Sequence, residues 1–161
     1  MNNNYRVKIE EARDLLKKGH PKEAIEYFSK LTNEAKAPGE VFLYAAMTYD
    51  NVGNEEEAIP FYEEALNRGI ENAKELRDCY VCLASSHRIE GNLFKSLAYL
   101  EQAKEKLPGD SVIAVFTALT LFDGKEFSKA VNELGNTLLD ETENKELLNY
   151  ERALREYFKS I

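Results

Sequence analysis

The amino-acid sequence predicts an all-α protein built from about four helix–turn–helix repeats. The first observation is that small residues, each following a turn, recur at nearly constant spacing, at Ala24, Ala58, Ser96 and Ala130. The second is composition, because Ala, Leu, Glu and Lys, which favour helices, outnumber the β-branched residues. The third is the stretch 142–160, whose apolar residues are spaced three or four apart on one helical face.

The stretch Tyr49–Leu66 shows the repeated unit most clearly. It reads as the end of one helix, a turn marked by Gly53, and the first turns of a second helix. Glycine suits this turn because the chain needs a left-handed residue there. Gly19 and Gly91 hold the same place, whereas the fourth repeat has Gly124 one place earlier. The fourth turn is therefore expected to differ slightly from the others.

These positions predict four pairs of helices. The first helices run over about 4–18, 40–52, 73–90 and 111–123, and the second helices over about 21–35, 55–68, 93–106 and 127–139. Ala58 and its equivalents are small, so that the two helices of a pair approach closely. A large side chain at Ala58 is expected to cost about 1–3 kcal/mol through overpacking.

The interval between Ala58 and Ser96 is the one irregularity of the repeat. It is four residues longer than the other two intervals, and the extra residues fall between Asn67 and Arg77. Because four residues are close to one helical turn, the third repeat's first helix can begin a turn early without rotating its buried face. A longer loop containing Gly69 is the alternative.

The recurring residues resemble the tetratricopeptide repeat, a helix–turn–helix unit of about 34 residues. The second repeat reads Phe42-x-x-Ala45-Ala46-x-x-Tyr49, then Gly53, Ala58, Tyr62 and Ala65, and the third reads Tyr80-x-x-Leu83-Ala84-x-x-His87, then Gly91, Ser96, Leu100, Ala103 and Pro108. Other aromatic and small residues replace the family's usual Trp, Leu and Gly, and its closing Pro survives only at Pro108. The resemblance implies a right-handed α-solenoid, with repeats at about 5–38, 39–72, 73–110 and 111–141 and a C-terminal capping helix at about 142–160.

The family's first helices line a concave surface that binds a partner, so the resemblance implies a groove here. The residues at the family's ligand-facing positions that we select for this groove are Ile9, Arg13, Leu43, Met47, Asn51, Val81, Ser85, Arg88, Val115, Leu119 and Phe122. The Lys/Asn/Arg clamp with which some family members bind a C-terminal carboxylate is not reproduced. The predicted groove is apolar, which suits a helix or an extended apolar segment. The alternative for each residue is packing inside the array or under the C-terminal helix.

Charge and hydropathy exclude several classes of partner. The formal net charge of −8 gives the chain little attraction to nucleic acid or to an anionic membrane. No apolar run approaches the roughly 20 residues that span a bilayer. The N-terminus lacks the apolar centre of a secretion signal, so a cytoplasmic location is expected.

No group of residues predicts catalysis. Cys79-x-x-Cys82 falls inside a predicted helix, away from the helix start that would activate a redox thiol, and lacks two further zinc ligands. His87 holds the place of an aromatic packing residue, and His20 lies in a turn. Glu55–Glu57 begins a helix, where carboxylates favour the positive end of the helix dipole. We therefore predict no enzyme activity, no cofactor and no metal.

The sequence predicts a non-catalytic scaffold that binds a protein or peptide partner whose identity the residues do not specify. One alternative is a homodimeric assembly module, in which the apolar surface or the 142–161 helix joins two copies. Another is a secretion-type chaperone, because bacterial type III secretion chaperones are small, acidic, dimeric proteins of similar repeats. A small enzyme with an unrecognised site is the last alternative.

Overall fold

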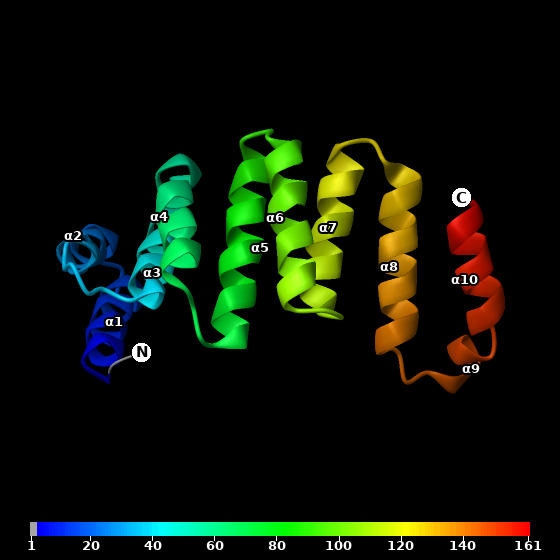
Figure 1. The fold of residues 1–161 in the computed structure, drawn as a ribbon, viewed down its shortest axis with the longest axis horizontal. Helices are drawn as coiled ribbons and strands as arrows, with labels where there is room; N and C mark the ends of the chain where they lie inside the picture. The colour runs from blue at the N-terminus through cyan, green and yellow to red at the C-terminus, as the bar shows by residue number, and fades with distance from the viewer. Residues whose placement is uncertain (1–2) are drawn as a thin grey trace.

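The computed structural model describes residues 3–161, which form ten helices and no strand (Figure 1). The helices are α1 (Asn3–Lys17), α2 (Pro21–Thr32), α3 (Gly39–Asp50), α4 (Glu55–Arg68), α5 (Ala73–Ile89), α6 (Leu93–Lys106), α7 (Ser111–Asp123), α8 (Phe127–Glu141), α9 (Lys145–Leu148) and α10 (Glu151–Ser160).

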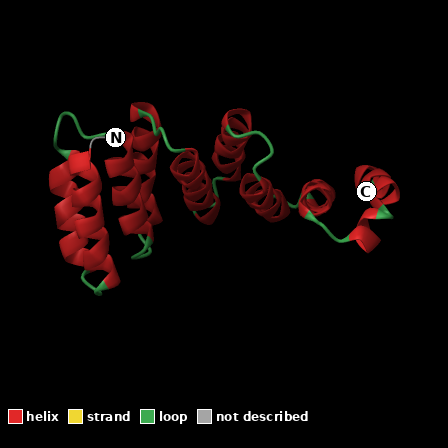
Figure 2. Cartoon of the chain, turned by 90° about the horizontal axis from the view of Figure 1, so that it is seen from below, coloured by secondary structure: helices red, strands yellow, loops and turns green. Residues whose placement is uncertain are grey.

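The first eight helices form four pairs that follow one another along the long axis of the molecule (Figures 1 and 2). Each helix from α1 to α7 packs against the next one in the chain, and α10 packs against α8. The first helices of the pairs also contact one another in the order α1, α3, α5, α7, so they share one side of the array. This arrangement confirms the predicted all-α helical repeat array.

The predicted positions of the eight repeat helices agree with the structure to within a turn at every end. The structure differs in the C-terminal segment 142–160, which contains two helices instead of one. Asn144 caps the short α9 by accepting hydrogen bonds from the backbone N–H groups of Glu146 (3.0 Å) and Leu147 (3.4 Å). The chain then turns before α10 begins at Glu151.

The four extra residues lengthen a helix, as predicted. The stretch from the start of α5 at Ala73 to Ser96 is four residues longer than the equivalent stretch from the start of α3 at Gly39 to Ala58. Helix α5 therefore gains one N-terminal turn, and the loop before it keeps Gly69 in the left-handed region with φ 87°.

The fourth turn differs from the others, also as predicted. Gly53 and Gly91 both have φ 76°. In the fourth repeat Gly124 has φ −75°, and Lys125 takes the left-handed conformation with φ 63°. Side chains are strained in this region, at a cost of about 1–2 kcal/mol.

The hydrophobic core becomes smaller toward the C-terminus. The larger cluster of buried residues extends from Ile9 to Leu83, and a smaller one extends from Tyr80 to Ile113. Ala58 is fully buried, in keeping with its small size at a close helix contact. No residue of α9 or α10 is buried. The last helices are therefore held by fewer apolar contacts than the first ones.

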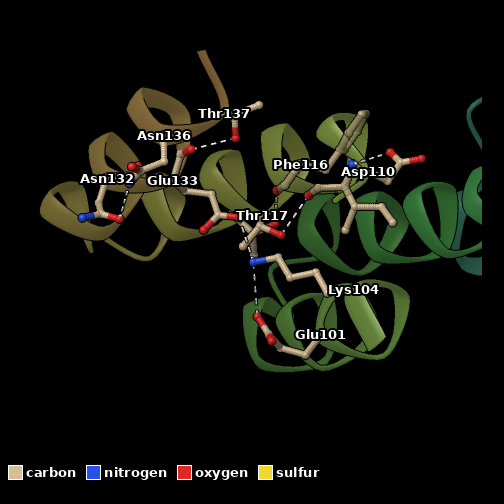
Figure 3. A network of polar contacts seen from close by, with 11 residues as sticks. Glu101, Lys104, Asp110, Phe116, Thr117, Asn132, Glu133, Asn136 and Thr137 are labelled. Atoms are coloured by element: carbon tan, nitrogen blue, oxygen red, sulfur yellow. Dashed lines mark hydrogen bonds and ion pairs between the residues drawn. The ribbon is translucent and has the colours of Figure 1, made fainter. Parts of the chain in front are cut away.

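Charged contacts join neighbouring repeats where the core is thin. The Lys104 Nζ on α6 lies 2.8 Å from a Glu133 carboxylate oxygen on α8 and 3.6 Å from one of Glu101 (Figure 3). Partly exposed pairs of this kind contribute at most about 1 kcal/mol. The contact therefore orients α8 more than it stabilises it.

Candidate partner-binding groove

A groove of about 660 Å³ lies between α1, α3 and α5, which are three of the first helices. We call it the α1–α3–α5 groove. Its lining residues are Arg6, Ile9, Glu10, Arg13, Leu43, Tyr44, Met47, Asn72, Lys74, Glu75 and Asp78.

Four of the residues selected from the sequence line this groove. Ile9 and Leu43 are 2% and 0% exposed, so they form its apolar floor. Met47 and Arg13 are half-buried and leave part of each side chain available to a ligand. The first two repeats therefore bring together all of their selected residues except Asn51.

The extra turn of α5 forms one wall of the groove. Asn72 caps this turn by accepting a hydrogen bond of 3.0 Å from the backbone N–H of Glu75. Lys74 and Glu75 then stand in the groove lining. The four-residue insertion thus gives the second and third repeats a polar wall that a regular repeat spacing would lack.

A chain of polar contacts crosses the groove from α1 to α5. The Arg13 guanidinium lies 4.9 Å from the centre of the Tyr44 ring and 2.5 Å from a Glu10 oxygen. The Tyr44 hydroxyl donates a hydrogen bond of 2.9 Å to Glu75 Oε1. Burial, together with this hydrogen bond, raises the pKa of Tyr44 to about 12. The hydroxyl therefore remains a donor at neutral pH.

One acceptor in this wall is unused among the described residues. The second carboxylate oxygen of Glu75, Oε2, is buried without a hydrogen-bond partner there. An unsatisfied buried acceptor costs about 1–3 kcal/mol, more when it is charged. A ligand that brings a hydrogen-bond donor to Glu75 would relieve this cost.

The walls of the groove are more polar than the sequence predicted. Basic Arg6, Arg13 and Lys74 line the groove together with acidic residues of α1 and α5. The prediction of an apolar groove describes the floor alone, because most of the charged residues come from positions outside the selected set.

The other selected residues lie outside this groove. Val81 is 6% exposed and packs in the smaller core cluster. Asn51 is exposed where α3 ends, and Ser85 is half-buried on α5. Arg88 donates a hydrogen bond of 2.6 Å to Asp123 and so joins α5 to α7.

Three selected residues form an exposed apolar stripe on α7. Val115, Leu119 and Phe122 are 38%, 41% and 59% exposed.

The groove residues Tyr44, Lys74 and Glu75 were not selected from the sequence. The four-residue insertion before α5 was the sequence feature that could have indicated Lys74 and Glu75 as groove residues. No local sequence pattern indicates that Tyr44 lines the groove.

The two cysteines lie in an environment that disfavours thiolates. Cys79 is fully buried and Cys82 partly buried, both on α5. Burial raises the pKa of both thiols, that of Cys82 to about 11. A thiolate is the reactive form of cysteine, so neither residue is an activated nucleophile at neutral pH.

His87 packs as an aromatic residue. Its ring stacks on Tyr99 with the ring centres 5.5 Å apart. Across residues 3–161, no three His, Cys, Asp or Glu residues are grouped so that they could hold a metal ion. In the same part of the chain, no helix has the length and apolar content needed to cross a membrane.

Comparison with protein families finds one match over most of the chain. The family model described as Tetratrico peptide repeat matches residues 39–161. Comparison with curated proteins finds no match.

Solved structures share the fold at low sequence identity. The crystal structure of YrrB, described as a TPR protein with an unusual peptide-binding site, aligns with a TM-score of 0.68 and 18% identity over 88% of this chain and 71% of that one. A MamA fragment from Desulfovibrio magneticus RS-1 aligns with a TM-score of 0.63 and 16% identity over 99% and 98%. A double mutant of MamA RS-1 aligns with a TM-score of 0.65 and 15% identity over 99% and 97%.

Proposed function

Because this chain belongs to the tetratricopeptide repeat family, we propose that it is a non-catalytic scaffold that binds a peptide or helix of a partner protein in the α1–α3–α5 groove. The observation that carries the proposal is the convergence of Ile9, Arg13, Leu43 and Met47 on one groove. These residues occupy ligand-facing positions of the family and come from two different repeats. The peptide-binding site of YrrB makes a peptide the first class of ligand to test.

The groove defines the chemistry of the segment it would bind. The apolar floor and Met47 suit one apolar side chain, since burial of such a side chain contributes about 1.5–3 kcal/mol. The free oxygen of Glu75 suits a donor beside that side chain, such as a backbone N–H or a lysine. We therefore expect a segment with an apolar anchor flanked by polar groups.

The proposal is tested in two steps. Affinity capture with the full chain, followed by mass spectrometry, identifies binding partners, and peptides covering the partner are then titrated against the purified protein. Met47→Glu places a charge over the apolar floor and should weaken binding at least about tenfold. Lys74 is an exposed residue of the groove wall, so Lys74→Glu is expected to keep the fold. A change in its affinity for the peptide therefore reports on the groove itself.

Val52→Glu is the matched control, because Val52 is an exposed apolar residue in the turn after α3, outside the groove lining. It should bind the peptide as the unmodified protein does. The proposal fails if the Met47→Glu and Lys74→Glu variants keep their helical circular dichroism and bind the peptide with unchanged affinity.

A further inference from the structure

Eight apolar side chains form an exposed surface across α7 and α8, which we call the α7–α8 face. They are Val112, Val115, Leu119, Phe122, Phe127, Val131, Leu134 and Leu138. The Phe122 and Phe127 rings meet edge to face with their centres 5.1 Å apart. Val112, Val115, Leu134 and Leu138 line one hollow of about 450 Å³. These contacts show that the two helices contribute to one continuous surface.

The size and composition of the α7–α8 face are those of an interface. Its residues are 38–59% exposed, and side chains of this size leave roughly 600 Å² of apolar surface open to water. Monomers rarely expose a larger patch, and a stable interface covers about 800 Å² on each partner. The stretch from Ser111 to Phe122 includes no charged residue. Depletion of charge is typical of the centre of an interface.

The corresponding surface is covered in the preceding repeats. Leu134 holds the place of Tyr62 in the second repeat and of Leu100 in the third. Tyr62 and Leu100 are 0% exposed, whereas Leu134 is 43% exposed. The difference arises because α4 and α6 are each followed by the first helix of another repeat, α5 and α7, which packs against them. The α7–α8 face is therefore shaped to receive apolar side chains from another element.

Helix α10 packs on a different side of α8. Its Phe158 ring lies on Gly135, and its Arg155 Nη1 donates a hydrogen bond of 3.0 Å to Asn136 Oδ1. Asn132 Nδ2 donates one of 2.8 Å to the Phe158 carbonyl. Figures 1 and 2 show α10 beside α8 at the end of the array. The C-terminal segment leaves the α7–α8 face open.

Helix α1 of another copy is a poor occupant for this face. The side of α1 that would continue the array carries Val7 together with Arg6, Glu10, Glu11 and Asp14. In α3 the positions equivalent to Val7 and the three carboxylates are Val41, Tyr44, Ala45 and Thr48, none of which is charged. Burying three carboxylates against an apolar surface is unfavourable, even though each of them has one partner within its own chain. This charge difference disfavours head-to-tail stacking of copies.

We propose that the α7–α8 face pairs with the same face of a second copy around a twofold axis. Apolar surface then meets apolar surface, and Glu141 is the one charged residue that lines the hollow. A twofold contact is also closed, so assembly stops at two copies. Because each chain carries a net charge of −8, moderate salt should strengthen the pair by screening repulsion. The pair leaves the α1–α3–α5 groove of each copy open and does not depend on the function proposed above.

Sedimentation or light scattering of the full chain under reducing conditions tests the proposal. The unmodified protein should show twice its mass of 18.4 kDa. Leu134→Glu and Leu119→Glu change the two helices of the face separately, and each should shift the mass to that of a single copy. Phe94→Glu is the matched control, because Phe94 is 83% exposed on α6 outside the face. It should remain paired.

Three results would overturn the proposal. The first is that the unmodified protein has the mass of one copy at all concentrations up to about 100 μM, which is high enough to detect weak pairing. The second is that Leu119→Glu keeps its helical circular dichroism and remains paired, which would place the contact elsewhere. The third is that the mass rises beyond two copies with concentration, which would indicate open head-to-tail stacking. If Leu134→Glu fails to fold, Leu119→Glu decides the result alone.

Discussion

The Phe158 ring lies directly on Gly135, where a Cβ atom would stand 2.5 Å from Cε2 of the ring. The second and third repeats carry Glu63 and Glu101 at the place of Gly135. The fourth repeat, against which α10 packs, thus has no side chain at this position. The Phe158 ring can therefore approach the backbone of α8.

Gly135→Ala is expected to loosen α10 while the other helices keep their packing. The added methyl group displaces the Phe158 ring, and α10 has no buried residue that would hold it in place. Amide hydrogen exchange should show at least about fivefold less protection in α10, which corresponds to roughly 1 kcal/mol. Phe158→Ala should have the same effect by removing the ring. Unchanged protection of α10 in both variants would show that other contacts hold this helix.

Lys125→Gly is expected to stabilise the protein by about 1 kcal/mol, because glycine adopts the left-handed conformation of residue 125 without strain. Chemical denaturation measures the change. Gly91→Ala is the opposite variant at the equivalent turn, where no atom lies within 4 Å of an added Cβ. It should destabilise by a similar amount through backbone strain alone. A destabilised Lys125→Gly variant would contradict this account.

Stability is expected to fall as the pH drops below about 6.5 because of His87. This side chain is 4% exposed, and burial lowers its pKa from the ordinary value of 6.5. Between the two pKa values, His87 is protonated in the unfolded chain but neutral in the folded chain. The free energy of unfolding is therefore highest above pH 6.5 and decreases as the pH falls from 6.5 toward the pKa of His87 in the folded chain. One such group changes the free energy of unfolding by at most about 1.4 kcal/mol per pH unit.

Denaturation of the unmodified protein and of His87→Phe at pH 7.5 and 5.5 measures this contribution. The phenylalanine keeps the stacking on Tyr99 and removes the titrating group, so the difference between the two pH values should shrink. His20→Gln, at the exposed histidine, should keep the fall of the unmodified protein. If the free energy of unfolding of His87→Phe decreases between pH 7.5 and 5.5 as much as that of the unmodified protein, groups other than His87 cause the pH dependence.

Tyr62→Phe is expected to destabilise by about 1–3 kcal/mol. The Tyr62 hydroxyl donates a hydrogen bond of 2.5 Å to Asp50, and without it the half-buried carboxylate keeps only a 3.4 Å contact with Ser86. In the first repeat the equivalent pair is Leu16 and Phe28. The double variant Asp50→Leu/Tyr62→Phe should therefore recover stability relative to Tyr62→Phe. A double variant less stable than the single one would contradict this reading.

The helices could be predicted because their signals are local. The turn at Gly53 and the small residue Ala58 recur at fixed spacing, and the insertion before α5 matches one helical turn. The break between α9 and α10 could not be predicted, because the apolar spacing of Leu147, Tyr150 and Leu154 continues across it.

The groove could be predicted only in part. The family pattern placed Met47 and its neighbours on a shared surface, but the contact between Tyr44 and Glu75 joins two consecutive repeats through residues 31 positions apart. It depends on how the repeats stack, which no local pattern specifies. Likewise, the pattern marked Leu119 and Phe122 as surface residues without showing that the surface above α7 and α8 stays uncovered.

The uneven distribution of the core has a consequence for biosynthesis. The buried residues of the larger cluster end at Leu83, so about half of the chain contains them all. Domains fold from the N-terminus as they leave the ribosome. A nascent chain can therefore assemble its main core while α7 to α10 are still being made. The apolar residues of α7 and α8 are then the last large apolar group to emerge, on a chain whose earlier repeats have already folded.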